Sequence, residues 1–301
     1  MDFNVNMFDL HIHSDHSSDG VLTPFEILTV MRSRGINMFS ITDHNSLASA
    51  NVMKWYEGRY GSKTLYVNGV ELSLYKGDRE IHVISYAYDD SCPTMAAALE
   101  VYNRNKVMQS EMRVEKLQDL GFRVDYHEVM KAAGGKMPSG VTLLKVLSKY
   151  TENREALYDY LEGPKSDSPY TNFYFDYFTK GGVAYVDVPL MDYEETIGKL
   201  KNKSVLVIAH PGLYKDKHIS ELVIDGIDGI EVYSSYHKDE DIEYFKKYAS
   251  ENGLLMTAGS DFHGDRIKPN IYLGGHGCPD LALANKFIER IKPYEKGYFL
   301  I

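Results

Sequence analysis

The chain has 301 residues, of which 44% are hydrophobic and 25% are charged, as is typical of a globular protein. Its formal net charge is −10 and it has no long basic run. That charge argues against a long nucleic-acid track, but it does not exclude a small anionic substrate beside bound cations. The only cysteines, Cys92 and Cys278, lie far apart, so we expect neither a disulfide framework nor a thiolate zinc site. We see no leader sequence and no membrane span, and we therefore expect a cytoplasmic protein without a membrane partner.

Strands and helices alternate along the first 91 residues. A strand is expected at residues 7–13, and a helix should follow from Pro24. Thr23 caps that helix, proline occupies its first position, and Glu26 stands three residues after the cap, which is the pattern of a capping box. Gly35 can end the helix. The next elements are expected as a strand at 36–42, a helix from about 46 to 60, and strands at 64–72 and 80–88.

The last third of the chain repeats this alternation. Short apolar segments at 204–209, 229–233 and 254–259 predict strands, and a helical stripe before Gly253 separates the last two. Strands separated by helices indicate βαβ units and a largely parallel sheet, either closed as a barrel or open.

The middle of the chain, residues 92–177, does not follow the alternation. A long helix is expected at 95–120, ending at Gly121, and further helices rich in tyrosine follow. No Gly/Ser-rich or Pro-rich linker bounds this region, which favours an insertion over a tethered domain. We therefore predict a barrel formed by residues 1–91 and 178–301, with a helical insertion at 92–177 that forms part of the substrate pocket.

Histidines and carboxylates gather where the predicted strands end. They are His11, His13, Asp19, His44, Glu71, His82, His210, Asp261 and His263. A lone histidine in a strand is more often a satisfied core residue, but this many buried polar groups would be costly without cations. In a parallel αβ barrel the strand ends meet on one face, so these residues are expected to form a metal site. Nitrogen and oxygen ligands suit Mn, Zn or Fe, and nine of them imply two or three divalent ions.

The order of these motifs resembles that of a known family. The motifs are DLHIHS, SDG followed by LTP, TDHN, GVELS, the His82 strand, AHPG and GSDFHG. They are similar to the motif set of the PHP (polymerase and histidinol phosphatase) family, most of all to its bacterial phosphoesterases that hydrolyse nucleoside monophosphates or 3′,5′-bisphosphates. The resemblance implies an α/β protein with a distorted (β/α)7 barrel and a trinuclear metal centre.

The same resemblance implies roles for individual residues. The three ion sites would be formed by His11, His13, Glu71 and Asp261; by Glu71 as a bridge with His82 and His210; and by Asp19, His44 and His263. Asp9 and Asp43 adjoin these segments and are expected to orient imidazoles without binding an ion themselves.

The sequence departs from the family pattern at two places. The stretch between HIHS and SDG is one residue longer than usual, so Asp15 or His16 could replace Asp19 at the third ion. An Arg-Pro-His-like segment of the family corresponds here to residues 136–140. That second departure affects the substrate assignment and leaves the metal ligands unchanged.

We interpret the protein as a hydrolase of a small phosphate monoester, most readily AMP or a nucleoside 3′,5′-bisphosphate, in which a hydroxide bridging two ions attacks phosphorus. His237 is the candidate general acid, and a solvated helix-start residue is its equally good alternative. The candidate substrate-binding residues are Ser139, Arg104, Lys136 and Arg266, although each such side chain alone is more often simply solvated.

Other functions fit parts of the pattern. A histidinol-phosphate phosphatase and a 5′→3′ exonuclease acting on short oligonucleotides would use the same metal chemistry. A metal-dependent amidohydrolase could also use a His-x-His barrel. A non-catalytic metal-binding module would be expected to have lost ligands, and none of the nine candidates is missing.

Overall fold

The computed structural model describes residues 3–59, 61, 63–214 and 219–301. The chain forms two compact units. The first comprises Met1–Lys76, Glu80–Ala98 and Asp192–Ile301, and the second comprises Gly77–Arg79 and Leu99–Met191. Within the described ranges, no helix is both long enough and apolar enough to cross a membrane.

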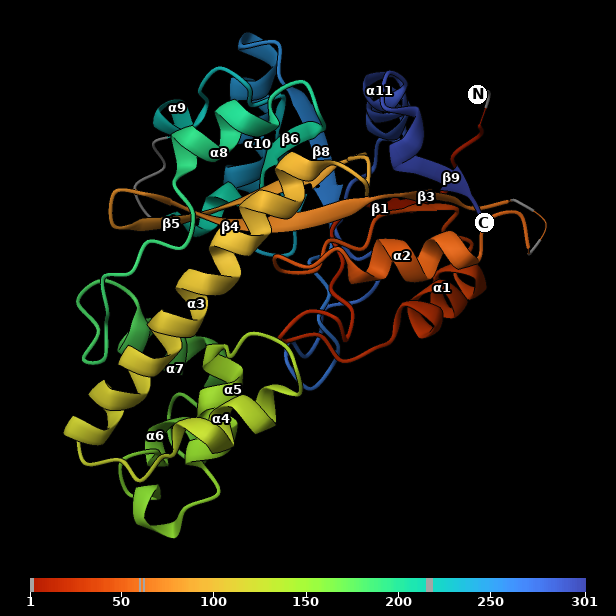
Figure 1. Ribbon diagram of the computed structural model, residues 1–301. Helices are drawn as coiled ribbons and strands as arrows, with labels where there is room; N and C mark the ends of the chain where they lie inside the picture. Colours follow the sequence, from red (N-terminus) through yellow and green to blue (C-terminus); the bar gives the residue numbers. More distant parts are fainter. Residues whose placement is uncertain (1–2, 60, 62, 215–218) are drawn as a thin grey trace. The chain divides into compact units, whose positions relative to one another are not determined.

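Two sheets form the centre of the first unit (Figure 1). The smaller sheet contains, in spatial order, β1 (Phe8–Asp9), β2 (Met38–Phe39), β3 (Leu65–Val67) and β9 (Tyr298–Leu300). Its first three strands are parallel, and β9 runs antiparallel to β3. The larger sheet contains β4 (Gly69–Lys76), β5 (Arg79–Tyr86), β6 (Val205–Ile208), β7 (Gly229–Ser234) and β8 (Leu255–Gly259). The expected single strand at 64–72 is therefore divided between β3 and β4.

The direction of β5 places one of the candidate ligands. Strands β6, β7 and β8 are parallel, but β5 is antiparallel to β6. Because of this reversal, His82 near the start of β5 lies level with the end of β6, where its carbonyl accepts a hydrogen bond from the Ala209 amide at 3.0 Å. A side chain near the start of an antiparallel strand thus reaches the same edge as side chains that follow the parallel strands.

The protein is a mixed α/β fold, but its strands do not form the single closed barrel that the resemblance implied. Among the described residues, isolated bridges from Ile12 to Phe262 and from His44 to Glu71 join segments that lie in or directly after strands of the two sheets. Backbone in the left-handed region occurs nearby, at Asn45 (φ 51°), His210 (φ 27°) and Asp261 (φ 54°). Such residues cannot continue a regular ladder, so pairing is interrupted where the candidate ligands lie.

The first helix follows the prediction closely. Helix α1 (Pro24–Ser33) has the capping box formed by Thr23 and Glu26, and Gly35 after it has φ 73°. Its buried face packs against α2 (Ala48–Trp55), which is shorter than the expected 46–60; residue 60 lies outside the described residues. Ile27, Leu28 and Met31 of α1 belong to a core cluster with Phe39, Tyr66 and Phe299.

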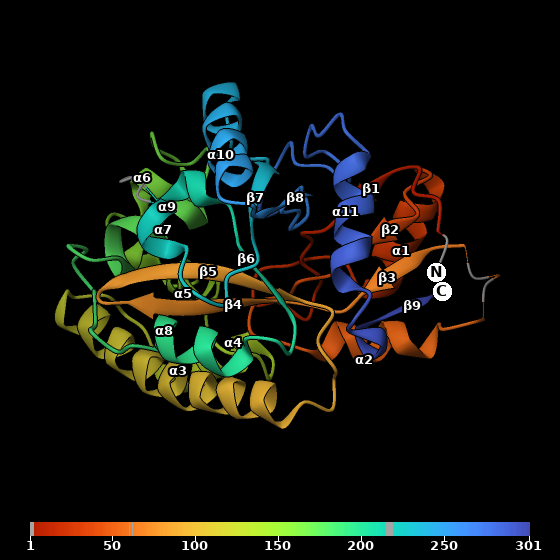
Figure 2. The same ribbon diagram turned by 90° about the horizontal axis from the view of Figure 1, so that it is seen from above.

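Further helices cover the larger sheet. Helix α10 (Asp239–Glu251) packs on β7 and β8, and α11 (Ala282–Ile291) packs on β8 (Figure 2). The same unit also contains α8 (Tyr193–Leu200), α9 (Ile219–Leu222), and the 3-10 turns at Pro211–Leu213 and Glu295–Gly297.

The second unit is helical. The long helix α3 (Pro93–Asp119) ends before Gly121, as expected, and its residues from Leu99 onward belong to this unit. It is followed by α4 (Tyr126–Ala133), α5 (Gly140–Leu147), a 3-10 turn at Thr151–Asn153, α6 (Tyr158–Leu161) and α7 (Pro169–Phe178). Leucine and phenylalanine side chains form its core, among them Leu117, Phe122, Leu143, Leu144, Phe173 and Phe178. The predicted insertion covered 92–177, and its part in a substrate pocket stays a prediction.

The close approach of β8 to the segment after β1 predicts a specific cost. A Cβ atom at Gly259 would lie 2.1 Å from His11 Cβ and 2.9 Å from Glu231 Oε1. We expect Gly259→Ala to lower the free energy of unfolding by about 1–3 kcal/mol through overpacking. Urea denaturation measures this loss.

Gly198, inside α8, provides the matched control because a Cβ there would meet nothing described within 4 Å other than its own helix backbone and chain neighbours. Gly198→Ala should stabilise the protein by about 0.5–1 kcal/mol. Equal effects of the two substitutions would contradict the described packing between β8 and His11.

Candidate metal centre

Five imidazoles surround the carboxylate of Glu71, a fully buried residue of β4. The distances to Glu71 Oε1 are 2.9 Å from His82 Nδ1 and 2.9 Å from His210 Nε2. The distances to Oε2 are 3.1 Å from His13 Nε2, 3.1 Å from His44 Nδ1 and 3.3 Å from His11 Nε2. These imidazoles come from four separate segments of the first unit, since His11 and His13 share one, so the fold gathers them around one acid group.

Asp261 contributes a second carboxylate to the same space. It follows β8, and its Oδ1 lies 3.2 Å from His11 Nε2 and 3.1 Å from His13 Nε2. Its other oxygen, Oδ2, accepts a hydrogen bond from Lys268 Nζ at 2.6 Å. The left-handed backbone of Asp261 (φ 54°) is a conformation that non-glycine residues adopt at a cost, which is a feature of functional sites.

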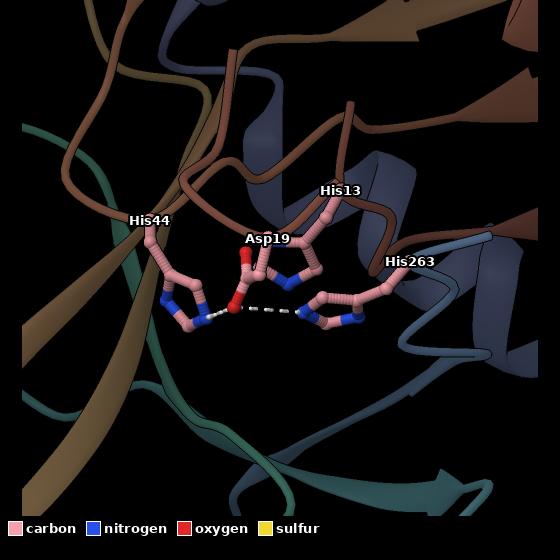
Figure 3. Close-up of side chains that lie close together, drawn as sticks. All are labelled: His13, Asp19, His44 and His263. Carbon is pink, nitrogen blue, oxygen red and sulfur yellow. Dashed lines mark ion pairs between the residues drawn. The ribbon is translucent and has the colours of Figure 1, made fainter. Parts of the chain in front are cut away.

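Asp19 forms a third focus with two histidines, and Figure 3 shows these side chains facing one another together with His13. Asp19 Oδ2 lies 3.6 Å from His44 Nε2 and 3.5 Å from His263 Nε2. Ser17 Oγ donates to Asp19 Oδ1 at 2.7 Å and holds this carboxylate in place. Of the three candidates for the third ion, the structure therefore brings Asp19 to the histidines, whereas Asp15 and His16 belong to none of the clusters below.

The donor atoms form three overlapping groups, within each of which they lie less than 4.8 Å apart. The groups are His11, His13, Glu71 and Asp261; His13, Asp19, His44 and His263; and His44, Glu71 and His82. His210 stands beside Glu71 without belonging to a group. All nine residues singled out in the sequence thus lie in one cluster, and their binding of ions remains a proposal.

The clustered nitrogen and oxygen atoms are better placed to bind divalent cations than to hydrogen-bond to one another. His11 Nε2 and His13 Nε2 face each other at 3.1 Å. Among the described residues, Glu71 Oε2, Asp261 Oδ1 and His210 Nδ1 are buried and make no well-aligned hydrogen bond. Each such group costs about 1–3 kcal/mol when it is left unsatisfied. Cations placed among these lone pairs would satisfy them, and the all-nitrogen and oxygen donor set suits Mn, Zn or Fe.

The pKa values show that protons compete for the same positions. Burial lowers the pKa of His13, but hydrogen bonds and charge from Asp261 and Glu71 outweigh it and raise that pKa to about 9. His82 likewise has its pKa raised to about 10, because Glu71 outweighs burial. Burial lowers the pKa of His44 to about 3, so its imidazole stays neutral between two carboxylates. Binding of ions would therefore displace protons from His13 and His82.

Glu231 orients the cluster and was missed in the sequence. Fully buried on β7, it places Oε1 3.0 Å from His11 Nδ1, and its Oε2 accepts the His210 backbone amide at 2.8 Å. A proton held between Glu231 and Nδ1 leaves His11 Nε2 free to bind an ion, which is how carboxylates tune histidine ligands. The available signal was a glutamate inside the apolar run GIEVY.

Asp9 and Asp43 accept hydrogen bonds from backbone and hydroxyl groups, and their expected role in orienting imidazoles stays a prediction. Asp9 accepts backbone amides of His11 at 3.3 Å, Ser260 at 2.9 Å and Gly274 at 2.7 Å. Asp43 accepts the Ser14 amide at 2.6 Å and its hydroxyl at 2.8 Å. Both carboxylates therefore fix the backbone of the segments that contain ligands, because these segments lack regular strand partners.

His237 is held by backbone groups at both ring nitrogens. Its Nδ1 donates to the Val232 carbonyl at 2.8 Å, and its Nε2 accepts the Gly212 amide at 3.0 Å. Burial lowers the pKa of His237, which agrees with a neutral ring in this role. The arrangement ties the end of β7 to the segment after His210. A general-acid role for His237 stays a prediction.

The substrate-binding candidates are distributed over both units. Arg266 is exposed in the first unit, and Arg104 is exposed on α3. Lys136 is partly buried, and Ser139 caps α5 by accepting the Thr142 amide at 3.4 Å. The cap gives Ser139 a structural role, and contact of these four residues with substrate stays a prediction.

Comparison with known proteins identifies the family. The family described as PHP domain matches residues 9–292. The chain belongs to the PHP domain family. It is 27% identical to the 3′,5′-nucleoside bisphosphate phosphatase of Chromobacterium violaceum, covering 85% of this chain and 86% of the relative. It is also 27% identical to a 5′-3′ exoribonuclease of Haemophilus influenzae, covering 85% and 89%. A crystal structure of a proposed metal-dependent phosphoesterase from Bifidobacterium adolescentis shares the fold, with a TM-score of 0.71, 22% identity, and coverage of 94% and 96%.

Glu231 gives this PHP domain a testable feature. Glu231→Gln keeps the shape of the side chain but weakens its hold on His11 Nδ1, so we expect Mn²⁺ affinity to fall about 10–100-fold. Isothermal titration calorimetry measures the Mn²⁺ affinity of each variant. The control is Glu243→Gln on α10, whose side chain is 75% exposed. Equal affinity in the Glu231 and Glu243 variants would show that Glu231 does not orient a ligand.

Proposed function

We propose that this PHP-domain protein removes phosphate from a small nucleotide, with a nucleoside 3′,5′-bisphosphate as the first candidate substrate and AMP as the second. Membership of the family makes the protein a metal-dependent phosphoesterase, and hence a hydrolase. The observation that carries the proposal is the convergence of five imidazoles on the two oxygens of Glu71.

The residues of the cluster would divide the work of holding two or three ions. Glu71 presents both oxygens and can bridge two positions, and neutral His44 presents Nδ1 to Glu71 and Nε2 to Asp19. When bound, divalent ions would lower the pKa of water to about 7 and neutralise the oxygens of the transferring phosphoryl group. Glu231 and the Asp261 carbonyl hold the outer ring nitrogens of His11 and His263, which keeps the inner nitrogens available to bind.

The proposed substrate class rests on the names of two relatives and on the net charge of this chain. The two relatives at 27% identity are named for a nucleoside bisphosphate and for ribonucleic acid, both of which have phosphate esters on ribose. A net charge of −10 without a long basic run disfavours a long track for nucleic acid. A single nucleotide needs no such track, because the ions would neutralise its phosphate locally.

Two alternatives use the same site. A 5′-3′ exonuclease acting on short oligonucleotides is favoured by the H. influenzae relative, and a histidinol-phosphate phosphatase would act on another small monoester.

The proposal also includes a distorted (β/α)7 arrangement of the first unit, which the bridges from Ile12 to Phe262 and from His44 to Glu71 support. It further includes a cytoplasmic location.

A screen with Mn²⁺ separates the candidates when it measures phosphate release from the monoesters and nucleotide release from the oligonucleotide. The substrates are adenosine 3′,5′-bisphosphate, AMP, histidinol phosphate and a short 5′-phosphorylated oligoribonucleotide. We expect the highest kcat/KM for the bisphosphate, followed by AMP. A clear preference for the oligonucleotide or for histidinol phosphate would replace the proposed substrate while leaving the phosphoesterase chemistry intact.

Glu71→Gln is the control that links turnover to the cluster. Even residues that only orient metal ligands are worth about 10–100-fold, so loss of this shared carboxylate should reduce turnover of every substrate by at least about 100-fold. Undiminished hydrolysis by the Glu71 variant would mean that the measured activity arises elsewhere.

A further inference from the structure

Lys268 contacts a carboxylate of the candidate metal centre although its charge opposes cation binding. Its ammonium is 2.6 Å from Asp261 Oδ2 and 4.7 Å from the centre of the Tyr236 ring, and the side chain is only 18% exposed. Removing a lysine charge from water is costly unless the charge is paired. Here the ion pair with Asp261 and the face of Tyr236 provide that compensation.

The backbone directs Lys268 toward Asp261. A turn begins at Gly264, directly after His263, and the Gly264 carbonyl accepts the amides of Ile267 and Lys268, each at 3.0 Å. Gly264 has φ 94°, and a Cβ there would lie 2.8 Å from Val21 Cβ. The turn therefore depends on glycine, and it returns the chain to the carboxylate seven residues before Lys268.

The two oxygens of Asp261 consequently have different surroundings. Oδ1 faces His11 Nε2 at 3.2 Å and His13 Nε2 at 3.1 Å, whereas Oδ2 is engaged by the ammonium. A carboxylate without such a partner could rotate, or could offer both oxygens to one ion. With Lys268 in place, Asp261 offers Oδ1 alone, in a fixed direction.

We propose that Lys268 is a positioning residue that holds Asp261 as a one-oxygen ligand of the ion site formed with His11, His13 and Glu71. The inference rests on the proposed function, because it requires that this group binds an ion. It assigns a role to a residue that the sequence patterns did not single out.

The direction in which Mn²⁺ affinity changes when Lys268 is replaced separates a positioning role from the alternatives. If Lys268 acted only through its charge, its removal would relieve repulsion and strengthen cation binding. If it only filled space, Mn²⁺ affinity would not change. Positioning predicts the opposite sign, because a freed Asp261 must lose rotational freedom before it binds.

The experiment is Mn²⁺ titration by calorimetry of the full-length wild type, Lys268→Met and Lys268→Arg, with metal retained after gel filtration measured in parallel. We expect Lys268→Met to lower the affinity of one ion by about 10–100-fold and Lys268→Arg to restore most of it, because arginine keeps both the charge and the donor. The control is Lys201→Met, which breaks a surface pair with Asp225 at 2.5 Å and should leave binding unchanged.

Unchanged or stronger Mn²⁺ binding by Lys268→Met would overturn the inference. Should that variant fail to fold, Lys268→Gln takes its place, and the same two results would overturn it. Failure of the proposed function is distinguishable, since the wild type itself would then bind no Mn²⁺ or release no phosphate. A wild type that binds Mn²⁺ and hydrolyses esters, beside a Lys268 variant of equal affinity, would refute the positioning role alone.

Discussion

The structure depends on the burial of one carboxylate, Glu71, among imidazoles that cannot all donate to it. Five ring nitrogens lie within 3.3 Å of its two oxygens, and each neutral imidazole has only one N–H to give. In the protein as described, raised pKa values at His13 and His82 let protons supply part of the missing positive charge. Divalent cations would supply it more completely, which makes ion binding and the stability of this cluster two aspects of the same electrostatic requirement.

The surrounding fold compensates for the irregular backbone that this requirement imposes. His210 and Asp261 have left-handed backbone, and the chain around the ligands leaves the regular ladders. Buried carboxylates then take over as acceptors for amides: Asp9 binds three of them, and Glu231 binds that of His210. Since buried amides need partners, these acidic residues are part of the scaffold as much as of the metal chemistry.

Much of the site could be predicted because histidines and acidic residues are uncommon at the ends of buried apolar strands. Histidines and acids at the ends of apolar strands identified all nine clustered residues, and the Thr23–Glu26 box fixed the start of α1. Strand direction could not be predicted, because an apolar run such as residues 80–88 has the same pattern in either orientation. Glu231 could not be identified because its partners are distant in sequence. Lys268 could not be identified because the turn from Gly264, which brings it back to Asp261, has no strong sequence signal. The backbone partners of His237 could not be predicted, because such hydrogen bonds leave no trace in a motif.

Anomalous X-ray diffraction from crystals of the wild type grown with Mn²⁺ tests the central claim most directly. The account predicts two or three anomalous peaks inside the cluster, about 2.0–2.3 Å from nitrogen and oxygen donors that include Glu71, Asp261 and Asp19. A map without a peak between these side chains, at saturating Mn²⁺ and with the imidazoles still facing Glu71, would contradict it.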